Sequence, residues 1–313
     1  MRTRVAVAVV LASIGVAACG QAPKEAPAPT STPTPATPDT PVQITEKWRA
    51  KHETDYRRDW VTIAGLFPLK PGANTAGSAP TNDIVLAASQ PALIGRFVLS
   101  GDRVRFEPAS GVNVKLRDQP VSAPVDLKDD AVKDSDELVI GDERLVIHVT
   151  GTTRTLRVRN PNGAPAKEFL GFSWFPIDLE YRVTGRFIAD ATPKSMRVLN
   201  TFGDNDPYTT DGLIEFALHG QTMQVRPFTT RPKRFYIVFR DASSGHETYE
   251  TARFVYADLL DDGTSVLDFN QAYNPPCAFN PYTTCPIPLR ENRLPIKILA
   301  GEKAYPVKVK QGR

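Results

Sequence analysis

Most of the side chains that could do chemistry in this chain lie in one stretch near its C-terminus, residues 267–286. The stretch reads LDFNQAYNPPCAFNPYTTCP and combines a carboxylate with amides, hydroxyls and prolines. Asp268 is the candidate general acid or base, because a positioned carboxyl group can exchange a proton with a substrate. The candidate ligand-binding residues, within this stretch and beyond it, are Asn270, Asn274, Asn280, Tyr282, Thr283, Arg293 and Arg182.

The backbone around these side chains is expected to hold them in place. If the segment is extended, Asp268 and Asn270 point to one side, and Leu267 and Phe269 point to the other. Prolines stiffen the loop that follows, and fixed donors need no reorganisation when a polar ligand binds. We therefore predict that the loop forms one wall of a binding or catalytic cleft. The alternative is that it plugs one end of a barrel, with its Asn and Asp side chains only capping turns.

The first 18 residues have the pattern of a lipoprotein signal peptide. Arg2 and Arg4 precede an apolar run, Val5–Ala18, which is shorter than the roughly 20 residues that span a bilayer. Small residues then precede Cys19, as in the bacterial lipobox, so Cys19 is the predicted site of lipidation by acyl chains such as palmitate. Because Gly20 follows, we expect the lipid bilayer as a partner, at the periplasmic face of a Gram-negative outer membrane.

Lipidation of Cys19 leaves the other two of the three cysteines, Cys277 and Cys285. In an oxidising periplasm this pair is predicted to form a disulfide that pins the loop. The alternative is a pair of thiolates that binds a metal ion, but no histidine lies nearby and the spacing differs from that of zinc sites. No metal site is predicted.

A tether and a helix come before the rest of the fold. Residues 19–41 are rich in Pro, Ala and Thr, which is typical of an extended linker. A helix is predicted to begin at Thr40-Pro41, where Gln43 completes a capping box. One face of this helix carries an aromatic-rich stripe that is expected to pack on a sheet. The stripe consists of Ile44, Trp48, His52, Tyr56 and Trp60.

Beyond the helix the pattern is that of antiparallel strands. Short runs of alternating polarity are separated by turns that contain Gly and Asp. The break at Asn160–Pro165 divides them into residues 42–163, the helix with a β-sandwich, and residues 164–313, an antiparallel β-barrel or sandwich. Lys297–Ala300 is the last expected strand. The predicted fold class is all-β with one N-terminal amphipathic helix.

Composition and motifs exclude several classes of function. The chain has 313 residues and a formal charge of +3, which falls to +1 when Arg2 and Arg4 leave with the signal peptide. A nearly neutral chain without a Lys/Arg run is poorly suited to bind nucleic acid. It has neither a Gly-x-Ser-x-Gly elbow nor a glycine-rich phosphate loop. We expect no cofactor, and the oligomeric state stays open.

Residues 66–159 resemble a forkhead-associated (FHA) sandwich in the order of their Gly and Asn-Asp turns. The Gly-Arg and Ser-x-x-His elements by which that fold reads phosphothreonine are replaced here by Ala76-Gly77-Ser78 and Leu93-Ile94-Gly95-Arg96. The resemblance therefore implies an FHA-like β-sandwich without phosphopeptide binding.

A second resemblance covers Trp48–Tyr305. It rests on Ala272–Pro286, Glu291–Leu294 and Ala300–Tyr305, together with Asp59–Leu69, Phe175–Val183 and Glu247–Phe254. These segments resemble the bacterial domain of unknown function 1684 family. The family brings no established activity, but the resemblance implies that the helix, the sandwich and the C-terminal half form one unit. It also places Trp60, Arg182, Tyr249 and Arg253 near Asp268.

Three functions fit these residues, and the sequence does not decide whether the chain is an enzyme. A hydrolase or lyase would use Asp268 as acid or base, Asn270 and Asn274 to orient the substrate, and Arg293 or Arg182 to hold an anionic group. A non-catalytic lipoprotein would bind a small polar ligand with the same loop. The alternative is a structural or interaction module of an outer-membrane assembly.

Overall fold

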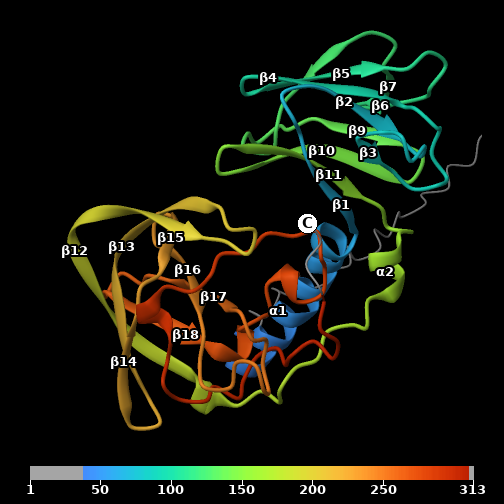
Figure 1. Cartoon of the computed structure of the whole chain (residues 1–313). Helices are drawn as coiled ribbons and strands as arrows, with labels where there is room; N and C mark the ends of the chain where they lie inside the picture. Colours follow the sequence, from blue (N-terminus) through green and yellow to red (C-terminus); the bar gives the residue numbers. More distant parts are fainter. Residues whose placement is uncertain (1–37, 310–313) are drawn as a thin grey trace, which may run out of the picture. The chain divides into compact units, whose positions relative to one another are not determined.

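The computed structural model describes residues 38–309, which are mostly β-structure with one long helix at the N-terminal end (Figure 1). This confirms the predicted fold class. The signal peptide, the lipidation of Cys19 and most of the tether lie outside the described residues. Within residues 38–309, no helix is both long and apolar enough to cross a membrane.

Helix α1 (Pro41–Tyr56) begins where the capping box predicted. Thr40 Oγ1 accepts a hydrogen bond from the Gln43 N–H, and the Gln43 side chain accepts one from the Thr40 N–H, so the capping box is confirmed. These two bonds satisfy backbone donors that the first turn leaves open. A single π-helical turn, Arg57–Val61, follows directly.

The aromatic stripe of α1 packs into a buried cluster. Trp48, His52 and Tyr56 lie against the ring of Tyr273, which lies outside the named strands and in turn contacts Phe254 of a C-terminal sheet. The stripe is therefore buried against the β-structure through Tyr273 and not by direct packing on a sheet, and Ile44 is 44% exposed.

The first β-unit is a sandwich of a six-stranded and a five-stranded sheet. The six-stranded sheet has the order β1-β11-β10-β9-β6-β7, and the five-stranded sheet the order β3-β2-β4-β5-β8. Phe97 and Phe106 from one sheet and Leu138, Leu145 and Leu156 from the other share one buried core. The strands are β1 Ile63–Pro68, β2 Gly72–Gly77, β3 Ile84–Val85, β4 Gly95–Ser100, β5 Arg103–Pro108, β6 Lys115–Leu116, β7 Gln119–Pro120, β8 Val125–Leu127, β9 Glu137–Ile140, β10 Glu143–Thr150 and β11 Thr153–Arg159.

The C-terminal part contains a four-stranded sheet, β14-β13-β12-β18, and a three-stranded sheet, β15-β16-β17. Its longest strands, β12 and β13, form a hairpin that stands out in Figure 1. Short helix α2 (Ala164–Glu168) precedes this part. The strands are β12 Arg182–Leu199, β13 Asn205–Leu218, β14 Gln221–Val225, β15 Phe228–Arg231, β16 Arg234–Phe239, β17 Arg253–Asp258 and β18 Thr264–Asp268.

The two C-terminal sheets share a second core. Ile214 and Phe216 of β13 and Leu267 of β18 pack with Phe235 and Ile237 of β16. The described strands form open sheets and no closed barrel, so the sandwich alternative for this half is confirmed. Three short 3-10 turns, Phe269–Gln271, Pro276–Ala278 and Arg290–Asn292, interrupt the segment after β18.

The strand expected at Lys297–Ala300 is wrong. Arg253 extends its guanidinium to this segment and donates to the carbonyl oxygens of Ile298 and Ala300, which therefore do not pair with a strand. The next residue, Gly301, has a φ of +80°, and a Cβ there would lie 2.3 Å from the carbonyl oxygen of Ala272. Only glycine allows so close an approach to the loop after β18.

Candidate functional site

Asp268, the predicted acid or base, ends strand β18 and is 7% exposed. Its Oδ2 accepts a hydrogen bond from Thr45 Oγ1 at 3.1 Å and lies 3.5 Å from Arg182 Nε. Its Oδ1 accepts from the backbone N–H and the Nδ2 of Asn270, at 3.1 and 3.0 Å. The structure therefore brings Asp268, Asn270 and Arg182 together, and both carboxylate oxygens already have partners within the chain.

Asn270 does not extend β18, because Phe269–Gln271 is a 3-10 turn that folds the amide back onto Asp268. The amide also exchanges two hydrogen bonds with the backbone of Asp178, at 2.8 and 2.9 Å. The backbone carbonyl oxygen of Asn270 accepts from the guanidinium of Arg49 on helix α1. Asn270 thus joins three segments and has no exposed surface.

Asn274 meets a buried carboxyl group, that of Glu302. The Asn274 N–H donates to Glu302 Oε2 at 2.8 Å, and Asn274 Nδ2 donates to the carbonyl oxygen of Lys303 at 2.8 Å. Burial raises the pKa of Glu302 to about 8, although hydrogen bonds from Asn274 act in the opposite direction. Glu302 is 2% exposed, so it holds a proton inside the fold near neutral pH.

Asn280 fastens the loop to the start of the sandwich. Its Nδ2 donates to the carbonyl oxygens of Trp60 and Ile63, at 3.0 and 2.8 Å. Thr283 is buried as well and donates to the Asn280 carbonyl oxygen at 3.1 Å. Tyr282, in contrast, is half-buried and lines a small cavity. Of the predicted residues in this loop, Tyr282 alone lines one of the cavities described below.

The structure contains no disulfide bond between Cys277 and Cys285. Cys277 and Cys285 are both buried, and the Cys277 N–H donates to Cys285 Sγ at 3.4 Å. Burial, together with hydrogen bonding and charge from Cys277, raises the pKa of Cys285 well above its ordinary value. The two residues therefore adjoin as expected, while their covalent pairing stays a prediction.

Arg253, which the family resemblance placed near Asp268, belongs to a separate buried ion pair. Its Nη1 lies 2.7 Å from Asp241 Oδ2, and both side chains are fully buried. Ser243 donates to Asp241 Oδ1 through its N–H and its hydroxyl group. A buried charge needs such a partner, so this pair is part of the internal scaffold.

The wall predicted for a cleft is thus largely the interior of the protein. Asn270, Asn274 and Asn280 have zero exposure, and their amide donors bond to atoms of the chain. The plug alternative described such Asn side chains bonded within the chain, although the described strands form no barrel for the loop to close. A ligand would have to displace these internal hydrogen bonds before it could use them.

An open cleft lies downstream of the loop, where Arg293 is exposed. The cleft has a volume of about 480 Å³ and runs between strands β13 and β14 and the segment Glu291–Pro295. Its apolar lining includes Leu213 and Met223, and its charged lining includes Glu215, Arg226, Glu291 and Arg293. This volume falls in the range that small-molecule sites usually have.

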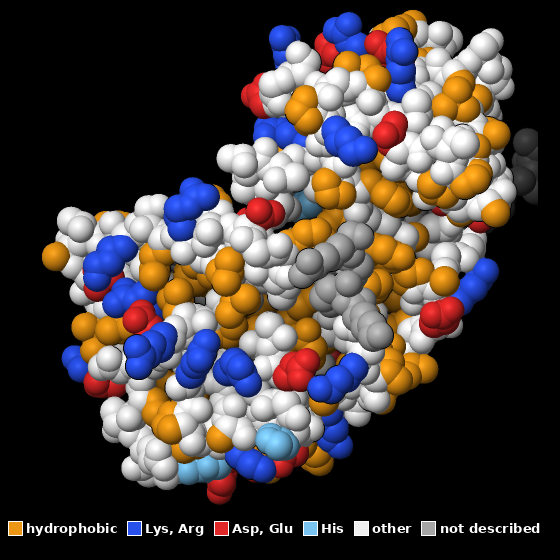
Figure 2. All heavy atoms as spheres, viewed as in Figure 1, with side chains coloured by type: hydrophobic (Ala, Val, Ile, Leu, Met, Phe, Trp, Pro, Cys, Tyr) orange, Lys and Arg blue, Asp and Glu red, His pale blue; other side chains and the backbone are white. Residues whose placement is uncertain are grey.

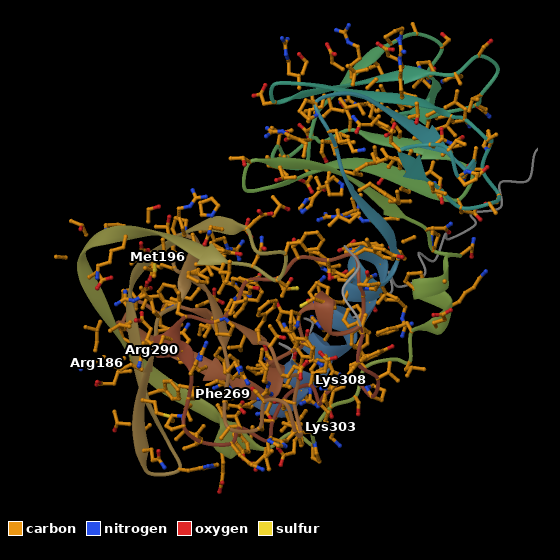
Figure 3. All side chains as sticks on the ribbon, viewed as in Figure 1. Arg186, Met196, Phe269, Arg290, Lys303 and Lys308 are labelled. Atoms are coloured by element: carbon orange, nitrogen blue, oxygen red, sulfur yellow. The ribbon has the colours of Figure 1, made fainter. Side chains whose placement is uncertain are left out.

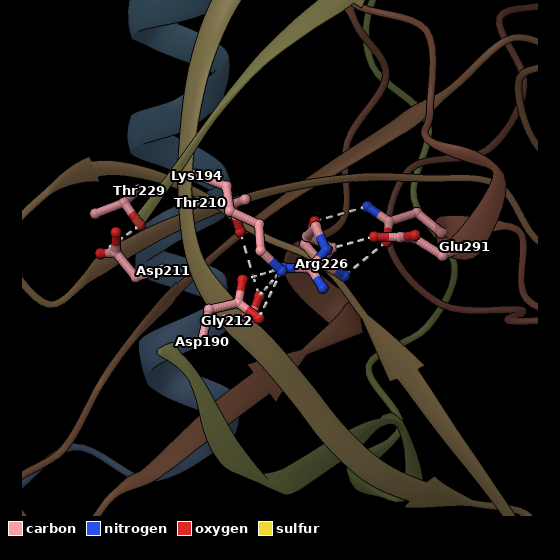
Figure 4. A network of polar contacts seen from close by, with 9 residues as sticks. Asp190, Lys194, Thr210, Asp211, Gly212, Arg226, Thr229 and Glu291 are labelled. Atoms are coloured by element: carbon pink, nitrogen blue, oxygen red, sulfur yellow. Dashed lines mark hydrogen bonds and ion pairs between the residues drawn. The ribbon is translucent and has the colours of Figure 1, made fainter. Parts of the chain in front are cut away.

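Arg226 forms the charged floor of this cleft, and Figure 4 shows its partners. Its Nη1 lies 2.7 Å from Asp190 Oδ2, and its Nε lies 2.5 Å from Glu291 Oε1. The Arg226 N–H also donates to Asn292 Oδ1 at 2.7 Å. Burial works to lower the pKa of Arg226, but the bonds to Glu291 and Asp190 outweigh it and raise the pKa overall. Arg226 is therefore a fixed, neutralised cation.

The carboxylate of Glu215, on the opposite wall of the cleft, also has partners within the chain. Glu215 accepts hydrogen bonds from Arg186 at 3.0 Å and from Gln224 at 2.9 Å. Arg293 differs, because among residues 38–309 no carboxylate lies within salt-bridge distance of it. Its backbone pairs with that of Arg240, and Arg290 lies one helical turn before it. Figure 3 labels Arg186 and Arg290 on this side, and Figure 2 shows Lys and Arg side chains interspersed with Asp and Glu on the lower part of the same view.

Arg293 was predictable from the sequence as a binding residue, but the other charged residues of the cleft were not. Arg226, Glu215 and Glu291 come from three separate segments, and only Glu291 stands in one of the segments that carry the family resemblance. The available signal was the alternation of strand β14, where the exposed residues Thr222 and Gln224 alternate with the buried residues Met223 and Val225, and Arg226 follows directly after the strand. Among residues 38–309, no group of three or more His, Cys, Asp or Glu side chains is placed to hold a metal ion.

The comparisons with known proteins concern mainly this C-terminal part. Residues 167–303 match the family described as "Protein of unknown function (DUF1684)", which confirms the resemblance for that segment. An uncharacterized protein of Haloarcula marismortui, solved by solution NMR, is 31% identical, with 44% of this chain and 78% of that chain covered and a TM-score of 0.38. No curated protein matches the chain.

A weaker match concerns a phosphopeptide-binding protein. EmbR of Mycobacterium tuberculosis, in complex with a low-affinity phosphopeptide, is 18% identical, with 38% of this chain and 31% of that chain covered and a TM-score of 0.21. Both TM-scores are too low to carry an argument about fold. The FHA-like character of the sandwich therefore stays a prediction.

Proposed function

We propose that the DUF1684 segment, residues 167–303, binds a small anionic ligand in the cleft at Arg293, and that the chain is an envelope lipoprotein. In this proposal Cys19 is lipidated and holds the protein at the periplasmic face of the outer membrane. The proposed site thus lies in the segment directly after the loop 267–286, and not in the loop itself. The observation that supports this position is the exposed guanidinium of Arg293, without an ion-pair partner among the described residues, beside a 480 Å³ cleft.

The ligand chemistry follows from which charges in the cleft are already used. Arg226 is neutralised by Asp190 and Glu291, and Glu215 is bonded to Arg186. Arg293 is therefore the residue in the cleft that can offer a guanidinium to a carboxylate or phosphate group by a bidentate contact. Leu213, Met223 and Leu294 would contact the apolar part of the ligand.

Binding is a better description of this cleft than catalysis. A reaction would need a carboxyl group with a free oxygen or an altered pKa at the ligand. Glu291 is committed to Arg226 and Glu215 to Arg186, while Asp268 is enclosed with Thr45 and Asn270. We therefore propose a non-catalytic binding protein.

A thermal-shift screen against anionic metabolites and glycans tests the proposal. A ligand at 100 times its Kd should stabilise the wild-type chain by about 2.7 kcal/mol. Arg293→Ala should weaken the binding by roughly tenfold to a hundredfold, because it removes a charge-assisted contact worth about 1.5–3 kcal/mol. Arg231→Ala is the matched control, because Arg231 is exposed on β15 and does not line the cleft. Equal loss in both variants, or none in Arg293→Ala, would contradict the proposal.

The lipoprotein part of the proposal has its own test. Membrane fractionation and mass spectrometry of the mature N-terminus should find an acylated Cys19, and Cys19→Ser should release the chain from the membrane. Mass spectrometry of non-reduced peptides should find Cys277 joined to Cys285. Free thiols at both positions in protein taken from the periplasm would rule the disulfide out.

A further inference from the structure

A second cavity lies at one end of the sandwich, where Tyr282 of the loop 267–286 meets residues of β1, β3 and β10. It has a volume of about 280 Å³, just below the range of drug-sized sites, and therefore suits a small ligand. Its lining is mostly apolar and includes Phe67, Val85 and Pro165. Two polar residues of the sandwich, Glu143 and Asn160, line it as well.

Glu143 is an unusual residue to find in such a lining. It is the first residue of β10 and is 2% exposed. Its Oε1 accepts one weak hydrogen bond, 3.3 Å long, from the Ala87 N–H. Its Oε2 is buried and has no hydrogen-bond partner among the described residues. A carboxyl oxygen that is buried and unpaired is costly, so its retention calls for a partner that comes from outside the chain.

No cation of the described chain fills that role. Arg144, the next residue, donates to the carbonyl oxygen of Glu143 and not to its carboxyl group, and Glu143 takes part in no ion pair among residues 38–309. Burial raises the pKa of Glu143, whereas the Ala87 N–H and, to a smaller extent, weak hydrogen bonding from the side-chain amides of Asn160 and Gln90 act in the opposite direction. A cation placed in the cavity would reverse that effect, because an opposite charge favours the ionised carboxylate.

We propose that this cavity binds a small organic cation, a primary alkylammonium, whose ammonium group pairs with Glu143. The buried carboxylate supplies the counter-charge and a hydrogen-bond acceptor. Phe67 and Tyr282 place aromatic rings in the same lining, and aromatic faces attract cations. Val85 and Pro165 accommodate the alkyl chain. This site is separate from the Arg293 cleft and takes a ligand of the opposite charge, so it stands or falls independently of the proposed function.

Saturation-transfer NMR on the full chain in detergent tests the inference with three probes of similar size: n-butylammonium, 1-butanol and butyrate. Wild-type protein should transfer saturation to n-butylammonium and much less to the other two. Glu143→Gln keeps the shape of the side chain and removes its charge, and should weaken n-butylammonium binding roughly tenfold to a hundredfold. The matched control is Asp126→Asn, which removes an exposed carboxylate from β8 and should leave the binding unchanged.

A second variant keeps the test decisive if Glu143→Gln folds poorly. Ala164 is exposed at the start of α2 and lines the cavity, so Ala164→Leu should block it and abolish the n-butylammonium signal. Binding that survives both substitutions overturns the inference. So does equal binding of 1-butanol, which would mean that the cavity recognises only the alkyl chain, and so does the lack of any n-butylammonium binding by the wild type.

Discussion

Replacing Asp268 by alanine should lower the stability of the protein without changing ligand binding at Arg293. In the structure Asp268 is buried at the end of strand β18, and its hydrogen bond with Thr45 joins this strand to helix α1. Its carboxylate accepts three hydrogen bonds, from Thr45 and twice from Asn270, and lies 3.5 Å from Arg182. The substitution removes the acceptor and leaves the buried donors of Thr45 and Asn270 without a partner.

The magnitude follows from these contacts. Hydrogen bonds to a charged group contribute about 1.5–3 kcal/mol each, but neighbouring bonds are not additive. Breaking a buried charge pair typically costs about 3–5 kcal/mol, which is the range we expect here. For a chain of this length each kcal/mol corresponds to about 2 °C, so the Tm should fall by roughly 6–10 °C.

Two milder variants separate the contributions. Thr45→Val removes one hydrogen bond to the carboxylate at nearly constant volume and should cost about 1.5–3 kcal/mol, or about 3–6 °C. Asp268→Asn keeps an acceptor for the Asn270 N–H but loses the charge, and should lie between the other two. If Asp268 and Thr45 interact directly, the double variant should lose less than the sum of the two single losses.

Calorimetry and the ligand screen together give the readout. We expect a lower Tm for Asp268→Ala and an unchanged affinity for any ligand that depends on Arg293. A variant that keeps its Tm within about 2 °C, a shift of only about 1 kcal/mol, and loses the ligand would refute it. Asp268 would then be the site residue that its position in the sequence suggested.

Three further changes test the buried polar groups. Burial raises the pKa of Glu302 to about 8, so the folded state keeps a proton that the unfolded chain releases above pH ~4.5. The free energy of unfolding should therefore fall by up to about 1.4 kcal/mol per pH unit as the pH rises to 8. Urea unfolding of Glu302→Gln should show no such dependence on pH. Burial lowers the pKa of His52 to about 4, so stability should fall as pH drops from ~6.5 to 4, and His52→Phe should abolish that loss; a variant with the wild-type slope would contradict either assignment. Asp241→Asn leaves Arg253 buried without its counter-charge and should cost about 3–5 kcal/mol, whereas Asp258→Asn, which breaks the partly exposed pair with Arg234, should cost less than ~1 kcal/mol in the same assay.

Local features of the fold could be predicted from the sequence because neighbouring residues determine them. The capping box needs Thr40 and Gln43 at a fixed spacing, and α1 begins there. Alternating polarity predicted most strands, because side chains of a strand point to opposite faces. Lys297–Ala300 has the composition of a strand, but Arg253 donates hydrogen bonds to two of its carbonyl oxygens. No sequence pattern near residue 297 predicts that contact.

The candidate site was harder to predict because an amide looks the same whether it binds a ligand or the backbone. The partners of Asn280 lie 220 and 217 positions away, at Trp60 and Ile63. Before these carbonyl oxygens are located, a rigid polar loop fits a cleft and a plug equally well. The exposed Arg293 was recognisable, whereas Arg226 owes its place in the cleft to the pairing of β13 with β14.

The bond between Thr45 and Asp268 joins residues 223 positions apart, and this separation dictates when folding can finish. Helix α1 leaves the ribosome early, while β18 and the loop that covers the aromatic face of α1 leave near the end. At about 5–20 residues per second the helix waits roughly 10–45 s for these partners. During that interval Trp48, Tyr56 and Trp60 lack their C-terminal cover. Such non-local closure slows folding, so the nascent chain needs protection from aggregation until its last fifty residues have been made.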